Sequence, residues 1–196
     1  MTDQQLHIWL DRLIDGDLSA FDFIYSQTKH KVYGTVAALV SNKEDVNDIV
    51  SEIYCQLWKA LPSYDRSRPF LFWLNGIVIK QVHNWRRQIW RRFRLFERNN
   101  RLSERLPIEM PDEPLLAHEI QLEIRNILLS LPFKQRIVII YRYDYEYTYE
   151  QIAELLEILV GTAKSRTHLA LKQIRKRYNH QLEQEGMSSH VYLKEN

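Results

Sequence analysis

The sequence contains few of the residues that build disulfide frameworks, zinc clusters and tight turns. Its 196 residues include one cysteine, five glycines and six prolines, whereas 45% are hydrophobic. The single cysteine, Cys55, excludes an internal disulfide and a cysteine-rich zinc site, and its place in an apolar helical stripe predicts a buried packing thiol. The composition as a whole is typical of a folded protein made of packed helices.

Long apolar runs and the patterns of common catalytic sites are also missing. No run approaches the roughly 20 apolar residues that a membrane-spanning helix needs, and residues 1–10 do not read as a signal peptide. We therefore expect a cytoplasmic protein. The sequence has no phosphate-binding glycine loop, no paired-histidine metal spacing and no nucleophile beside a base. These absences predict no catalytic residue, no metal, no cofactor and no small-molecule substrate, so we do not expect an enzyme.

Charge is distributed unevenly along the chain. The net charge is only +2, yet residues 86–105 contain eight arginines, and residues 172–177 form a second basic cluster. Acidic segments lie at residues 44–52 and 112–123. This separation predicts two kinds of partner, one polyanionic and one basic.

The hydrophobic spacing is helical throughout. Apolar residues of segments 46–61 and 120–131 recur every three or four positions, and we interpret the apolar run 137–141 as a buried helix. The proline-bearing segment 97–114 lacks a sustained apolar face. The sequence thus predicts an all-α protein of two small helical domains, residues 2–96 and 115–178, joined by a flexible linker at 97–114 and followed by a polar tail at 179–196.

The second domain predicts a helix-turn-helix. Thr148 can N-cap a helix that ends between residues 157 and 160, and a second helix starts near Gly161. Its inward side is predicted to carry Ala163, the Leu169–Ala170 pair and Ile174. Donor side chains would lie on the outward side and could enter the major groove of DNA. The alternative is an ordinary helical hairpin with a solvated basic face.

Four short motifs in this domain resemble region 4 of the extracytoplasmic function (ECF) sigma factors of the sigma-70 family. They are Leu131-Pro132, Gln135-Arg136, residues 149–153 (YEQIA) and residues 161–166 (GTAKSR). The resemblance implies recognition of the minus-thirty-five promoter element. It assigns this recognition to Thr162, Lys164, Ser165, Arg166, His168 and Lys172. Leu169 and Leu171 stand where the family has backbone-contacting charges, and Glu157 or Ile158 replaces a glycine common in the turn.

The first domain carries a second, independent match. Residues 45–54, followed by Leu57-Trp58, resemble region 2.2, the helix by which these factors bind core RNA polymerase. The resemblance assigns polymerase binding to the outward residues Asp45, Asn47, Asp48, Ser51 and Glu52, with Val46, Ile49, Val50 and Ile53 pointing inward. Ser51 replaces the usual glutamine. Taken alone, without the other motifs, this segment would be interpreted as a solvated acidic face.

Residues 70–74 and 85–87 resemble regions 2.3 and 2.4, in which aromatic rings and arginines are suited to binding single-stranded DNA. We expect Phe70, Trp73 and Leu74 to lie in the core. In the family, the preceding loop receives a base that is flipped out of the minus-ten element. The resemblance assigns minus-ten recognition to Tyr64, Asp65, Arg66, Ser67, Arg68, Lys80, Asn84, Arg86 and Arg87. Lys80 and Asn84 replace a usual asparagine and aspartate, which predicts stronger attraction to the DNA backbone.

The function predicted from these matches is that of an alternative-type sigma factor. Such a protein binds core RNA polymerase and directs promoter-specific transcription initiation through the minus-ten and minus-thirty-five elements. The resemblance also implies an anti-sigma partner. The alternative is a helix-turn-helix regulator that uses only its C-terminal hairpin, dimerises through the N-terminal helices and is not a polymerase subunit. The two differ in whether core polymerase is a partner.

Overall fold

The structure is a computed structural model that describes residues 3–96 and 124–184, and within these ranges all the regular secondary structure is helical. The predicted all-α class is confirmed. Two compact units meet in the chain after Arg125, and we describe each by itself. The predicted linker, residues 97–114, and most of the predicted tail lie outside the described residues, so the proposed domain boundaries stay predictions.

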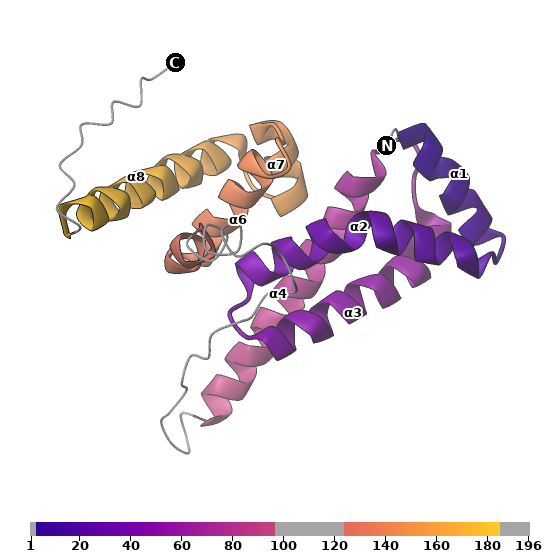
Figure 1. Cartoon of the computed structure of the whole chain (residues 1–196), viewed down its shortest axis with the longest axis horizontal. Coiled ribbons are helices and arrows are strands. Elements are labelled where there is room, and N and C mark those ends of the chain that lie inside the picture. The colour runs from indigo at the N-terminus through magenta and orange to yellow at the C-terminus, as the bar shows by residue number, and fades with distance from the viewer. Residues whose placement is uncertain (1–2, 97–123, 185–196) are drawn as a thin grey trace. The chain divides into compact units, whose positions relative to one another are not determined.

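Over residues 3–96, the first unit contains four long helices and a short turn of 3₁₀ helix. These are α1 (Asp3–Ile14), α2 (Leu18–Leu39), α3 (Lys43–Ala60), η1 (Leu61–Ser63) and α4 (Phe70–Phe96). Helix α2 packs against α1, α3 and α4, and α3 also packs against α4; Figure 1 shows α2 and α3 side by side. The most buried side chains include Leu10, Ile24, Val36, Val46, Ile53, Leu57 and Phe70. Burying each such side chain contributes about 1.5–3 kcal/mol.

Side-chain caps fix where two of these helices begin. Asp17 caps α2 by accepting a hydrogen bond from the backbone N–H of Ser19 at 2.9 Å. Hydrogen bonds from the Ser19 hydroxyl and from Arg12 hold the pKa of Asp17 below its ordinary value. Asn42 caps α3 in the same way, accepting from the N–H of Glu44 at 2.9 Å. Each cap satisfies a donor that the first turn of a helix otherwise leaves without a partner.

The second unit is the predicted helix-turn-helix with supporting helices before it. In this unit, residues 126–130 are helical and precede α6 (Phe133–Tyr143), α7 (Tyr149–Leu156) and α8 (Val160–Gln184). Arg136 is buried, and its Nη2 donates to the carbonyl oxygens of Leu129 at 2.8 Å and Leu131 at 2.9 Å. A buried guanidinium thus satisfies carbonyls at the end of one helix and ties it to the next. Residues 137–141 lie within α6 and are buried, as predicted.

Three tyrosines pack together where the chain turns from α6 to α7. Tyr141 is fully buried, and its ring centroid lies 5.2 Å from that of Tyr145 and 5.9 Å from that of Tyr147. Burial, followed by the two neighbouring tyrosines, raises the pKa of Tyr141 well above its ordinary value. Arg142 donates to the carbonyl oxygen of Tyr147 at 3.0 Å. These contacts fix the direction in which α7 starts.

The structure corrects two predictions about individual positions. Cys55 is exposed, because the buried positions of α3 around it are Ile53, Tyr54 and Leu57 and residue 55 lies on the other side of the helix. Leu169 is 48% exposed, whereas its neighbour Ala170 is fully buried. Helix α8 continues to Gln184, so it extends past the predicted start of the polar tail.

The turn between α7 and α8 contains a residue in the left-handed region. Glu157 caps α7 with φ 53° and ψ 49°. The single glycine that is common in the turn of the family corresponds to either Glu157 or Ile158 in this chain. A side chain with a Cβ pays about 1–2 kcal/mol to adopt this conformation, whereas glycine does not.

We therefore predict that Glu157→Gly raises the free energy of unfolding by up to about 1 kcal/mol, measured by urea denaturation. The matched control is Glu154→Gly, which places a glycine inside the same helix and should lower the stability by about 1 kcal/mol. A loss of stability in both variants would contradict the conformational argument.

Candidate nucleic-acid interface

A capping box sets the start of α7 and thereby the geometry of the hairpin. The Thr148 hydroxyl accepts from the N–H of Gln151 at 3.2 Å, and the Gln151 side chain accepts from the N–H of Thr148 at 2.9 Å. The predicted N-cap is confirmed. Reciprocal bonds of this kind satisfy two first-turn donors at once. Helix α7 therefore begins at a fixed residue, and the turn at Glu157 delivers the chain into α8.

Helix α8 buries one narrow face and leaves the opposite one open. Ala163, Thr167 and Ala170 are buried, and the Thr167 hydroxyl donates back to the carbonyl oxygen of Ala163 at 3.0 Å. Of the six residues predicted to bind the upstream element, four are exposed and two are half-buried. The exposed residues are Lys164, Ser165, His168 and Lys172, and the half-buried ones are Thr162 and Arg166. The structure thus brings together the donors that the sequence selected.

Two residues that the sequence reasoning missed are Tyr149, whose ring Lys164 approaches, and Arg142, which approaches the same ring. The Lys164 ammonium lies 5.8 Å from the ring centroid of Tyr149, and the Arg142 guanidinium lies 5.1 Å from the same ring. Both distances are in the range of a cation–π interaction. Hydrogen bonds of its own backbone and of Thr148 hold the pKa of Glu150 below its ordinary value, with Lys164 adding attraction. The start of α8, the second helix of the helix-turn-helix and its proposed recognition helix, therefore carries a cation that lies against an aromatic ring.

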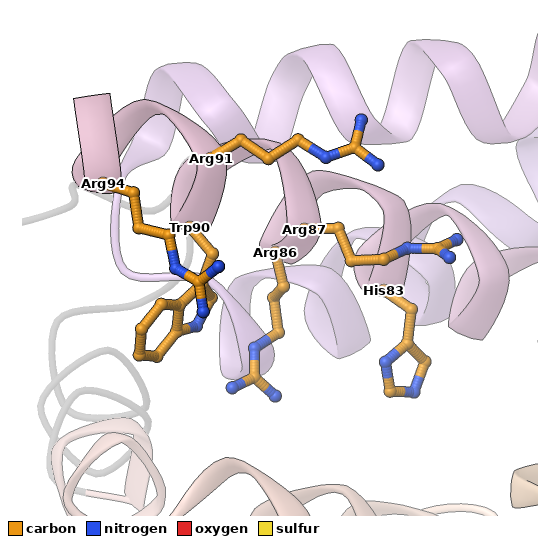
Figure 2. A pocket seen from close by; sticks show the side chains of 6 residues that line it. All are labelled: His83, Arg86, Arg87, Trp90, Arg91 and Arg94. Carbon is orange, nitrogen blue, oxygen red and sulfur yellow. The ribbon is translucent and has the colours of Figure 1, made fainter.

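Helix α4 presents a run of cationic side chains on its exposed side. Lys80 and Arg87 are exposed, Asn84 and Arg86 are half-buried, and Arg87 donates to the Asn84 side chain at 2.5 Å. Figure 2 shows that these arginines are part of a larger group. One pocket is lined by His83, Arg86, Arg87, Trp90, Arg91 and Arg94. Sequence analysis selected two of these six residues and missed the other four, although the arginine density pointed to the segment.

The six residues that line this pocket, which we call the α4 group, carry their charge on arginine and not on histidine. Desolvation, followed by the charges of Arg86 and Arg87, lowers the pKa of His83. Trp90 is 59% exposed, which is unusual for the largest aromatic side chain. An exposed indole among guanidinium groups can stack on a base or lie against a sugar while the arginines pair with phosphates.

The predicted base-receiving loop is a tight, mostly exposed turn over a buried ring. Residues 65–68 are exposed, and Asp65 accepts from the N–H and the hydroxyl of Ser67 at 2.9 Å and 2.8 Å. These bonds lower the pKa of Asp65. Tyr64 is buried, with its ring centroid 4.8 Å from that of Trp73. Tyr64 therefore lies below the loop as a support, whereas its four neighbours face solvent.

Polar and apolar residues of α3 lie on opposite sides of the helix, as predicted. Asn47, Asp48, Ser51 and Glu52 are exposed and Asp45 is half-buried. The four inward residues Val46, Ile49, Val50 and Ile53 are buried. Asp45 lies in the first turn of the helix, where a carboxylate is favoured by the helix dipole. One side of α3 therefore packs into the core, and the other side exposes carboxylates to solvent.

Two family models match the chain, in the order that the motifs predicted. The model described as sigma-70 region 2 matches residues 24–92, and the model described as sigma-70, region 4 matches residues 121–174. The first match covers α3 and most of α4, and the second covers the helix-turn-helix.

Curated relatives match over nearly their whole length. The RNA polymerase sigma-H factor of Pseudomonas aeruginosa is 28% identical over 184 residues, which cover 89% of this chain and 92% of the relative. The ECF RNA polymerase sigma-E factor of Escherichia coli K12 is 29% identical over 184 residues, covering 89% and 93%.

Solved structures share the fold at lower identity. The sigma factor RpoE in complex with the anti-sigma factor NepR, from Bartonella quintana, aligns with a TM-score of 0.65 and 18% identity, covering 80% of this chain and 94% of that one. CnrH in complex with the cytosolic domain of CnrY aligns with a TM-score of 0.62 and 18% identity, covering 88% and 96%. Among the helices of residues 3–96 and 124–184, none has the length and apolarity needed to cross a membrane.

The contact of Lys164 with the Tyr149 ring gives a testable prediction. Tyr149→Ala removes the ring that two cations approach, and we expect affinity for duplex promoter DNA to fall roughly twofold to fivefold, the value of a cation–π contact at an exposed site. Tyr149→Phe keeps the ring and should bind like the parent. Fluorescence anisotropy measures both. Equal losses in the two variants would assign the effect to the tyrosine hydroxyl and contradict the role of the ring.

Proposed function

The chain belongs to the extracytoplasmic function sigma factors of the sigma-70 family, and from this premise we propose how its surfaces divide the work of promoter recognition. As a member of that family it is a DNA-binding initiation factor that directs promoter-specific transcription. The observation that carries the proposal is that one chain combines an acidic α3 face with basic faces on α4 and α8. We propose that the protein performs no chemical step itself and acts in the cytoplasm.

The upstream minus-thirty-five element is assigned to α8. Its exposed donors Lys164, Ser165 and His168 lie in the first turns of the recognition helix, the part of such a helix that reaches base edges. Lys172 lies further along the same exposed side, where a cation pairs with phosphate. Half-buried Thr162 and Arg166 complete the surface.

The minus-ten element is assigned to α4 and the loop before it. Lys80, Arg86 and Arg87 attract the DNA backbone, Asn84 lies beside Arg87 as a polar contact, and the exposed loop residues 65–68 receive the flipped base. We add the remaining members of the α4 group, with Trp90 as the aromatic surface and Arg91 and Arg94 as phosphate partners. Unstacking a base costs a few kcal/mol, which stacking and edge contacts in this site must return.

Core RNA polymerase is assigned to the acidic face of α3. Carboxylates on one side of a helix fit a basic surface of a partner, and residues 24–92, which include this helix, match region 2. A helix-turn-helix regulator that works without polymerase does not require the N-terminal domain that matches region 2, and no feature of the described residues favours that alternative.

An anti-sigma factor is the second protein partner that we propose. RpoE of Bartonella quintana and CnrH were both solved in complex with another protein, NepR and the cytosolic domain of CnrY respectively. This chain shares their fold and, in α4 and α8, offers basic surfaces that an acidic protein could cover in place of DNA. Such a partner would silence both promoter contacts.

Charge reversal tests the polymerase surface. We expect Asp48→Lys to weaken binding to core RNA polymerase about tenfold, or about 1.4 kcal/mol, because it replaces attraction by repulsion at a complementary interface. Competition against labelled parent for core measures this. Glu154→Lys on α7 makes the same change of charge outside the proposed surface and should compete like the parent. If Asp48→Lys also competes undiminished, the α3 face is only solvated.

Leu169 provides a gain-of-function test on α8. The side chain is exposed between Ser165 and Lys172, whereas Leu171 packs beside the buried cluster of Leu131, Ile139 and Ala170. We expect Leu169→Arg to bind promoter duplex more tightly and to steepen the dependence of log K on log salt by about 0.9, the effect of one added phosphate contact. Asn179→Arg adds the same charge near the other end of the helix. Indistinguishable slopes for these two variants would place Leu169 outside the DNA surface.

A further inference from the structure

Helix α1 contacts the predicted base-receiving loop although it precedes the residues that match region 2. The match begins at residue 24, and α1 spans Asp3–Ile14. Helix α1 packs against η1, the turn that leads directly into the loop. Two side chains on successive turns of α1, His7 and Asp11, reach the loop itself.

The first contact runs through the buried tyrosine. The Tyr64 hydroxyl donates to the carbonyl oxygen of Arg68 at 2.5 Å, and His7 Nε2 lies 3.3 Å from the same hydroxyl. The rings of His7 and Tyr64 are 6.2 Å apart between centroids. One phenol oxygen thus connects α1 to the far end of the loop, four residues after Tyr64.

The second contact is an ion pair between Asp11 of α1 and Arg66 at the middle of the loop. Both side chains remain partly open to water, at 43% and 55% exposure. A pair this exposed adds little to the stability of a fold because solvent screens it and two long side chains lose freedom. Its effect is to hold Arg66, and the backbone that carries it, against α1.

We propose that α1 is a positioning element for base recognition, in which Asp11 and His7 hold loop residues 64–68 in the shape that receives the flipped minus-ten base. This inference rests on the proposed function of the loop. Ordering a loop during binding reduces affinity, so a loop that is already held gains affinity without any added contact to DNA. Hydrogen bonds between Asp65 and Ser67 hold the turn from within the loop. Contacts of His7 and Asp11 hold the loop against α1.

The test uses holoenzyme reconstituted from core polymerase and each full-length variant. The probe is a set of single-stranded oligodeoxynucleotides that carry the minus-ten element of a promoter the holoenzyme transcribes, with one base varied at a time. We expect Asp11→Asn to weaken binding of the preferred oligonucleotide about twofold to fivefold, the range of an exposed ion pair. Combining it with His7→Phe should weaken binding further and flatten the preference among bases.

Three controls separate positioning from general damage. Asp15→Asn removes the same charge one turn further along the chain and should match the parent. Asp11→Glu should restore most of the lost affinity. Duplex binding to the upstream element, core affinity and the melting temperature should not change in Asp11→Asn, because none of them depends on the loop.

The outcomes that overturn the inference are distinct from failure of the loop assignment. If Ser67→Ala and Arg68→Ala weaken oligonucleotide binding while Asp11→Asn, alone and with His7→Phe, binds like Asp15→Asn, the loop receives the base without help from α1. If the two loop variants also bind like the parent, the loop is not the base site, and the proposed function and this inference fall together.

Discussion

Packing of α8 against α6 and α7 is the contact on which the proposed DNA-binding surface of α8 depends. Small side chains make it possible, since Ala163 and Ala170 are fully buried and Thr167 turns its hydroxyl onto the carbonyl oxygen of Ala163. A helix seated on such a narrow face keeps the rest of its circumference open for partners. The recognition helix can therefore carry Lys164, Ser165 and the following donors without placing any charge in the core.

The pocket-lining residues of α4 lower the local stability of the helix. Like charges three or four residues apart on a helix repel, and Arg87, Arg91 and Arg94 have that spacing. An exposed Trp90 adds apolar area that the fold does not use. In the proposed minus-ten contact, DNA phosphates would relieve the repulsion and a base or sugar would cover the ring, so bound DNA would stabilise this segment.

The local features of the fold could be predicted, because helical spacing and caps depend on residues close in sequence. The inward side of α3, the Thr148 cap and the buried α6 were all predicted from such patterns. The exposure of Cys55 and Leu169 was not, because an apolar residue next to a stripe fits either side until the packing is known. The contacts Tyr149–Lys164 and His7–Tyr64 were missed because only tertiary structure joins residues so far apart, the second pair being separated by 57 positions.

We propose that the acidic and basic faces of this chain serve one machine, core RNA polymerase bound to promoter DNA. The most direct measurement is run-off transcription by core enzyme freed of every other sigma factor, on DNA selected by its binding to the reconstituted complex. The predicted result is specific transcripts that require this protein and disappear when Lys164 and Arg166 are both replaced by alanine. Promoter-specific DNA binding without any transcript from core would contradict the claim and favour a regulator that works apart from polymerase.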